Sequence, residues 1–204
     1  MNCETAEEGD QQMEIFYRLF LPPDFMKKEV NESVVFAMLK AAKNLQVSRR
    51  GIPPEPDFIA DGEGIEVTFA AGREASRDFI RQTCDGRFDP GASKAGEIGR
   101  IKSALSRKAE KFYSTRRTSL AILCMLELFD WAAGESRERE KFFRWIRREY
   151  IDAGIFHTVY LLLPSLNQEW FVYDLRREER RRLLILNYLQ APYYTVVNKG
   201  GTGG

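Results

Sequence analysis

The sequence predicts an α/β protein with a mixed central sheet flanked by helices. Two strongly apolar runs, Thr118–Phe129 and Ile155–Leu163, lack the polar alternation of a half-exposed strand, which indicates buried strands. Segments with helical spacing of apolar residues alternate with strand-like segments, in the order helix, hairpin, helix, strand, helix, strand. This alternation is typical of a sheet covered by helices.

The first part of the predicted fold is a helix followed by a hairpin. Apolar residues recur at helical spacing over Lys28–Ala42, and a proline-rich loop then ends the helical region. Asp57–Asp61 and Ile65–Ala70 form the two strands of the hairpin. A basic helix is predicted next, over Arg100–Tyr113, followed by the first buried strand. A charged helix over Arg137–Asp152, capped by Gly154, then leads to the second buried strand. The last predicted elements are a strand over Glu169–Tyr173 and an arginine-rich helix over Leu175–Leu189.

Length and composition suit one globular domain. The chain has 204 residues, of which 44% are hydrophobic and 30% charged, so it can bury a sizeable core. The 31 basic and 30 acidic residues give no overall field that would attract a polyanion. Cys3, Cys84 and Cys124 are odd in number and far apart, which argues against a disulfide framework or a zinc site. We expect a cytoplasmic protein without a membrane segment.

Changes of composition along the chain predict its organisation. Residues 1–14 carry five acids and no base and are expected to form a solvated acidic arm. Residues 15–197 are expected to form a single domain. Within it, residues 72–99 are rich in Gly, Asp, Ser and Arg and predict a long loop or lid insertion. Residues 198–204 predict a flexible glycine-rich tail.

The predicted hairpin gathers carboxylates on one face. If Glu63-Gly64 form a two-residue turn, Asp61 faces Glu66. Because side chains alternate at period two, the apolar side chains then share one face and the polar ones share the other. The polar set is Asp57, Asp61, Glu66 and Thr68.

Clustered carboxylates raise one another's pKa, and a divalent cation removes that penalty. Hard oxygen ligands of this kind suit Mg²⁺ or Mn²⁺. The alternative is that Asp57 is a turn residue and that Glu66 lies on a solvated sheet face.

Pro56-Asp57, followed by Glu66-Val67-Thr68, resembles the motif of the PD-(D/E)xK nuclease superfamily, which has the restriction-endonuclease-like fold. That motif places Pro-Asp on one strand and Asp/Glu-x-Lys on the next, between helices, and the resemblance covers about residues 28–163. It implies a metal-dependent phosphodiester hydrolase acting on DNA or RNA. Asp57 and Glu66 would then be catalytic residues and ligands of Mg²⁺ or Mn²⁺, with the Val67 carbonyl as a further ligand. A homodimer would suit a nuclease that cuts both strands.

The sequence departs from the motif at Thr68, where the family has a lysine that positions water or stabilises the transition state. Some members recruit this lysine from a neighbouring helix. Lys108 lies three residues after Leu105 and four before Phe112, within the apolar stripe of the basic helix. Such a lysine must reach solvent or meet a carboxylate. We expect it to pair with Glu66 and to act as the catalytic lysine; the alternative is that it extends to solvent along the helix.

Several further residues are candidates for supporting roles. A glutamate of the first helix, Glu32 or Glu29, could extend the metal site, as could Asp61 and Thr68, or these side chains could simply be solvated. The expected contacts to nucleic-acid phosphates are Lys102, Arg107 and Lys111. The arginines at 144, 147 and 148 and those over 176–182 either follow a phosphate backbone or form solvated helix faces. His157 lies in an apolar run and is expected to be a core side chain rather than a catalytic base.

Two other functions remain open at this point. Thr68 favours a nucleic-acid-binding module that keeps the nuclease fold and has lost cleavage. A protein-interaction domain using the charged C-terminal helix would bind neither metal nor nucleic acid. The chain has no Gly-x-x-x-x-Gly-Lys-Ser/Thr loop and no Gly-x-Ser-x-Gly elbow, which argues against a P-loop NTPase and a serine hydrolase.

Overall fold

The computed structural model describes residues 28–45, 49–70, 90–124, 137–164, 169–187 and 194–198. The expected acidic arm, the expected loop as far as residue 89 and the last six residues of the tail lie outside this part of the chain. The elements are α2 (Lys28–Lys43), β1 (Arg49–Arg50), β2 (Phe58–Ala60), β3 (Glu63–Phe69), α4 (Pro90–Ala109), β4 (Thr118–Leu123), α6 (Arg137–Ile146), the π-helical turn η1 (Arg147–Asp152), β5 (Val159–Pro164), β6 (Glu169–Asp174), β7 (Glu179–Asn187) and β8 (Tyr194–Asn198).

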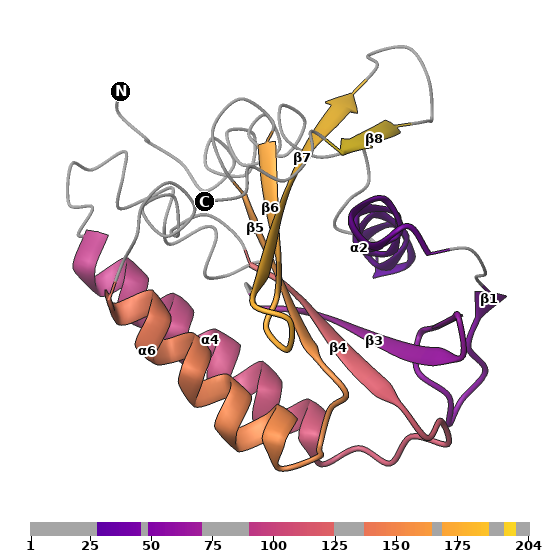
Figure 1. Cartoon of the computed structure of the whole chain (residues 1–204), viewed down its shortest axis with the longest axis horizontal. Coiled ribbons are helices and arrows are strands. Elements are labelled where there is room, and N and C mark those ends of the chain that lie inside the picture. Colours follow the sequence, from indigo (N-terminus) through magenta and orange to yellow (C-terminus); the bar gives the residue numbers. More distant parts are fainter. Residues whose placement is uncertain are drawn as a thin grey trace, which may run out of the picture.

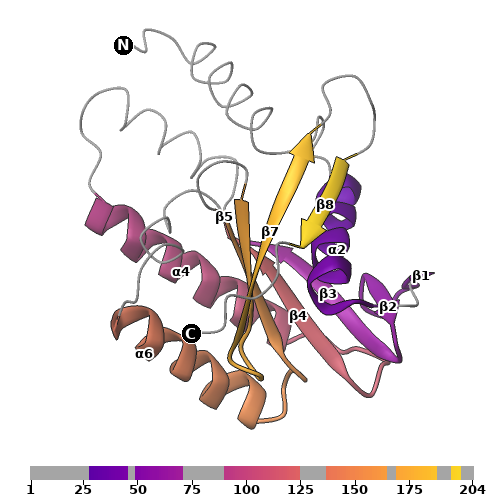
Figure 2. The same ribbon diagram turned by 45° about the horizontal axis from the view of Figure 1, so that its top comes forward.

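The described strands form one mixed sheet whose spatial order follows the chain, from β1 to β8. Strands β3, β4 and β5 are parallel neighbours, and the remaining pairs are antiparallel. The two crossovers, through α4 and α6, step across the sheet in the same direction. Because such crossovers are right-handed, both helices reach the same face. Figures 1 and 2 show α4 and α6 side by side on that face and α2 on the opposite face.

The sheet has an apolar core on each face. On one face, α2 packs against β2 and β3 and against alternate residues of β4, Ala121 and Leu123. On the other face, α4 and α6 pack against Leu120 and Ile122 of β4. All six residues of β4 are therefore buried, which explains why this strand shows no polar alternation in the sequence. The predicted α/β class with a mixed sheet and flanking helices is confirmed.

The hairpin turn lies two residues earlier than expected. Ala60 pairs with Glu63, so Asp61 and Gly62 form the turn, with φ of 50° and 75°. A two-residue turn with positive φ at both positions favours Asp-Gly, and the predicted Glu63-Gly64 turn is wrong for that reason. The two registers differ by an even number of residues, so each strand side chain keeps its predicted face.

Helix α4 starts and ends earlier than expected. It begins at Pro90, so the predicted loop over 72–99 is wrong for its last ten residues. Proline is well suited to a first helical turn, where its missing N–H has no helical partner. The helix ends at Ala109, and Phe112, predicted on its apolar face, is 79% exposed beyond that end.

The predicted C-terminal helix over Leu175–Leu189 is wrong, because residues 175–178 form a turn and residues 179–187 form strand β7. Residues 179–184 of β7 pair with β6, and residues 183–187 pair with β8. The buried Asp174 fixes the turn: its Oδ1 accepts hydrogen bonds from the backbone N–H of Arg176 (3.2 Å) and Arg177 (3.3 Å). Its Oδ2 also bonds Lys43 of α2 at 2.5 Å. Pairing and these contacts outweigh the helix propensity of the Arg, Glu and Leu residues.

The other predicted elements agree with the structure in type, but two strands are shorter than predicted. The strand predicted over Ile155–Leu163 begins only at Val159. The strand predicted over Thr118–Phe129 ends at Leu123, and residues 125–129 lie outside the described part of the chain. Helix α2 has the expected bounds to within one residue, and Gly154, with φ of 76°, follows the end of η1. Strand β6 lies within one residue of its predicted bounds and pairs with β5. His157 lies just before β5 and is half-buried, not inside the strand as predicted. No helix in the described part of the chain is long and apolar enough to cross a bilayer.

Candidate functional site

The candidate site begins at the edge of β3, where β2 no longer covers it. Strand β2 starts at Phe58, so the backbone of Val67 faces no partner strand on that side. The carboxylate of Asp57 takes this place, and its Oδ2 accepts a hydrogen bond from the Val67 N–H at 2.8 Å. This hydrogen bond therefore holds the Asp57 side chain next to the segment Glu66-Val67-Thr68.

Glu66 and Lys108 form a buried ion pair between β3 and α4. Glu66 is 4% exposed and Lys108 is 9% exposed. The Lys108 ammonium donates a hydrogen bond to Glu66 Oε1. Lys108 Nζ also lies 3.3 Å from the Val67 carbonyl oxygen. Lys111 reaches the same Glu66 oxygen at 3.1 Å from the exposed side. The predicted contact between Lys108 and Glu66 is thus present, and the alternative of a lysine extended to solvent is wrong.

Burial and charge move the pKa values of the two carboxyl groups in opposite directions. Burial raises the pKa of Asp57, and the charges of Glu66 and Glu32 add to this shift. Burial alone would also raise the pKa of Glu66, but the hydrogen bonds and charges of Lys108 and Lys111 outweigh it and lower that pKa. Burial lowers the pKa of Lys108 in spite of its carboxylate partner. Carboxyl groups with pKa values moved apart are typical of sites that transfer protons.

This site offers few oxygen ligands to a divalent cation. Asp57, Glu66 and the Val67 carbonyl offer the hard donors that Mg²⁺ and Mn²⁺ prefer. Two of these three groups already contact a cation, the Lys108 ammonium. The described residues hold no group of three or more His, Cys, Asp or Glu side chains suited to a metal. A divalent ion would therefore depend on two carboxylates, one carbonyl and water.

The expected accessory residues lie in different places. Glu32 of α2 is buried, contacts Arg50 at 3.2 Å and is close enough to Asp57 to raise its pKa. Thr68 lies on the Glu66 face of β3, where its hydroxyl accepts a hydrogen bond from Arg107 at 3.1 Å. Asp61 is exposed in the hairpin turn and does not join the strand face as predicted. The side chain of Glu29 lies outside the described residues.

The three basic residues expected to contact phosphates are all exposed. Arg107 and Lys111 lie beside the site, bonded to Thr68 and Glu66. Lys102 points elsewhere: its ammonium lies 4.9 Å from the centre of the Trp145 ring on α6. Two of the three are thus near the carboxylates, and the third is near a different helix.

Tyr113 belongs to the site although the sequence did not indicate it. Its hydroxyl lies 3.4 Å from the Lys108 carbonyl oxygen, and the side chain is half-buried. Burial raises the pKa of Tyr113, and the nearby charges of Glu66 and Asp57 add to this. The chain turns back after α4 ends at Ala109, and this turn cannot be foreseen from a continuous helical pattern.

Comparisons of the chain with protein-family models, with curated proteins and with solved structures found no significant match.

Proposed function

We propose that the protein is a metal-dependent phosphodiester hydrolase of the PD-(D/E)xK type that acts on DNA or RNA. The observation that carries this proposal is the position of Lys108, whose ammonium contacts Glu66 and the Val67 carbonyl. In this proposal, Lys108 of α4 replaces the lysine of the motif, whose position is occupied by Thr68 in this chain. The order α2, hairpin, α4, β4 also agrees with the restriction-endonuclease-like fold that the resemblance implies.

Each side chain has a separate task in this proposal. Asp57 and Glu66, with the Val67 carbonyl, would hold Mg²⁺ or Mn²⁺. The bound ion would lower the pKa of a water molecule and neutralise charge on the phosphate. Lys108 stabilises negative charge near the carboxylates, and its lowered pKa makes transfer of an ammonium proton easier than from an exposed lysine. Arg107 and Lys111, exposed beside the site, contact the phosphates that flank the reacting one.

Calorimetry with Mg²⁺ and Mn²⁺, paired with cleavage of plasmid DNA and of RNA, tests this function. We expect the wild-type protein to bind either ion and to cleave one substrate. Asp57→Asn and Glu66→Gln remove a ligand charge while they keep the shape of the side chain. We expect each variant to lose both metal binding and cleavage.

Asp61→Asn is the matched control, because it removes a carboxylate only four residues from Asp57. Asp61 lies in the turn with positive φ, which asparagine also adopts. We expect this variant to bind metal and cleave like the wild type. If the folded wild-type protein binds neither ion, the metal-dependent function is wrong.

The same contacts also support a second candidate function, which is nucleic-acid binding without cleavage. The Lys108 ammonium already neutralises Glu66, and the hydroxyl of Thr68 is bonded to Arg107. A protein with this arrangement could bind nucleic acid without cleaving it. Binding of a DNA duplex that is unaffected by EDTA, together with no cleavage in Mg²⁺ or Mn²⁺, would favour this inactive module over the hydrolase. A single domain over residues 15–197, a cytoplasmic location and a homodimer remain predictions.

A further inference from the structure

We propose that a basic groove on the surface of α6 binds the phosphate backbone of a nucleic acid. The groove has a volume of about 690 Å³, and it is lined by α6, η1 and the turn that joins β6 to β7. We call it the α6 groove. It is separate from the residues of the Glu66–Lys108 site, and the inference rests on the proposed function for the identity of the ligand as a nucleic acid.

The charge in the α6 groove is strongly unbalanced. Five of its eight lining residues are cationic, and Asp152 is the one carboxylate among them. Arg147 pairs with Glu178, and Arg148 pairs with Glu149 at 2.7 Å. The other three cations are Lys141, Arg144 and Arg176. Within the described part of the chain, no carboxylate forms an ion pair with any of them.

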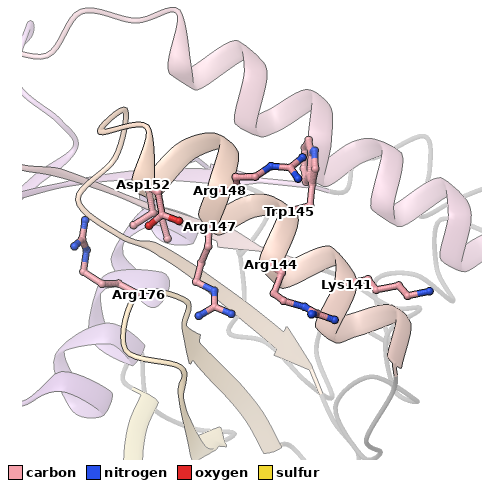
Figure 3. Close-up of a pocket in the computed structure, with 8 residues that line it drawn as sticks. Lys141, Arg144, Trp145, Arg147, Arg148, Asp152 and Arg176 are labelled. Atoms are coloured by element: carbon pink, nitrogen blue, oxygen red, sulfur yellow. The ribbon is translucent and has the colours of Figure 1, made fainter.

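The shape of the helix brings these cations together. Phe142, Phe143 and Ile146 are buried against the sheet, so the polar residues between them face outward. Figure 3 shows Lys141, Arg144 and Arg147 extending from one side of α6 and η1. The chain winds more widely at η1 than in an α-helix, and such π-helical turns frequently occur at functional sites.

A separate segment completes the groove. Arg176 comes from the turn after β6, where the Asp174 carboxylate holds its backbone N–H at 3.2 Å. Its guanidinium Nε donates to the carbonyl of His157, so the side chain is directed along this surface. A solvated helix face would need no such contribution from another element. Cations from two segments that meet in a hollow are the arrangement expected for binding an anion.

An aromatic side chain links the α6 groove to α4. Trp145 lines the groove, and the Lys102 ammonium lies 4.9 Å from the centre of its ring. Lys102 and Lys108 belong to the same helix, and six residues correspond to about 9 Å along its axis. Lys102 therefore extends the positive charge of the groove onto α4. A polyanion with regularly spaced charges, such as a nucleic-acid backbone, fits this distribution better than a small isolated anion.

The test measures binding without cleavage. A fluorescein-labelled DNA duplex, and separately a labelled RNA strand, is titrated with the full chain in EDTA between about 50 and 200 mM salt. We expect Lys141→Gln/Arg144→Gln to bind more weakly than the wild type. We also expect the slope of log K against log salt to fall by about 2 in magnitude, because each lost phosphate contact releases about one counterion fewer.

Lys40→Gln/Arg180→Gln is the matched control. It removes the same charge from exposed positions on α2 and β7, outside the groove. We expect the control to keep the wild-type slope, and thermal unfolding to show that both variants fold. An unchanged slope in the groove variant, an equal loss in both variants, or no wild-type binding to either nucleic acid would overturn the inference. Loss of metal binding or cleavage alone would overturn the proposed function and leave these binding curves unaffected.

Discussion

The Glu66–Lys108 site and the α6 groove use the same kinds of residue in opposite ways. Lys108 is 9% exposed and its ammonium lies on a carboxylate and a carbonyl. Lys141 and Arg144 are exposed, and within the described residues neither has a carboxylate partner. A buried charge must be paired for the protein to fold, whereas an exposed charge remains available for a ligand. The first arrangement therefore affects stability, and the second affects binding.

Lys108→Met is expected to give the largest loss of stability. The substitution keeps the length of the side chain and leaves the buried Glu66 carboxylate with only Lys111, which is exposed. Removal of one partner of a buried pair costs about 3 kcal/mol in the free energy of unfolding. Urea denaturation at neutral pH measures this loss.

The double variant Glu66→Leu/Lys108→Met sharpens that measurement. It removes both charges together, so we expect the free energy of unfolding to return to within about 1 kcal/mol of the wild type. If Lys108→Met alone has no effect on stability, the ion pair is not buried as described.

Asp57 is expected to matter for stability through one hydrogen bond. Asp57→Ala leaves the Val67 N–H without its acceptor and should cost about 2 kcal/mol. Asp57→Asn retains an acceptor oxygen and should cost clearly less, although it removes a ligand charge. Denaturation of both variants in the same buffer separates the hydrogen bond from the charge. Equal losses would contradict the proposed role of the N–H contact.

The pH dependence of stability provides a third measurement. The pKa of Glu66 in the folded protein is lowered below its ordinary value of 4.5. Its contribution to stability is therefore complete above that ordinary value and is lost as the pH falls through the folded pKa. We expect Glu66→Gln to be less stable than the wild type at neutral pH and the difference to shrink in acid. A difference that stays constant with pH would show that the charge of Glu66 is not responsible.

The smallest effect on stability is expected in the α6 groove. Lys141→Gln/Arg144→Gln should change the free energy of unfolding by less than about 0.5 kcal/mol, because both side chains are exposed. The same variant is expected to change binding to nucleic acid strongly. A large loss of stability would mean that these cations hold α6 in place, and the contrast with Lys108 would disappear.

The sequence predicted those features that depend on apolar spacing. The buried strand β4 followed from an apolar run without polar alternation, and the contact between Lys108 and Glu66 followed from a lysine inside an apolar stripe. Phe112 and the segment after Leu175 were misjudged, because a helical pattern does not reveal where a helix ends or that pairing will override it. Tyr113 and the N–H contact of Asp57 depend on chain turns between elements, which local patterns do not encode.

The open edge of β3 at Val67 has a consequence for mutagenesis. Asp57 and Lys108 contact the N–H and the carbonyl of Val67, while its side chain packs on the other core, against α2. Replacement of the valine side chain leaves both peptide groups in place. An alanine scan along β3 would therefore report only the loss of core packing at Val67, and not the peptide groups that join two parts of the site. Replacement of the 66–67 amide by an ester would reveal this role, because it removes the Val67 N–H, although it also weakens the Glu66 carbonyl as a hydrogen-bond acceptor.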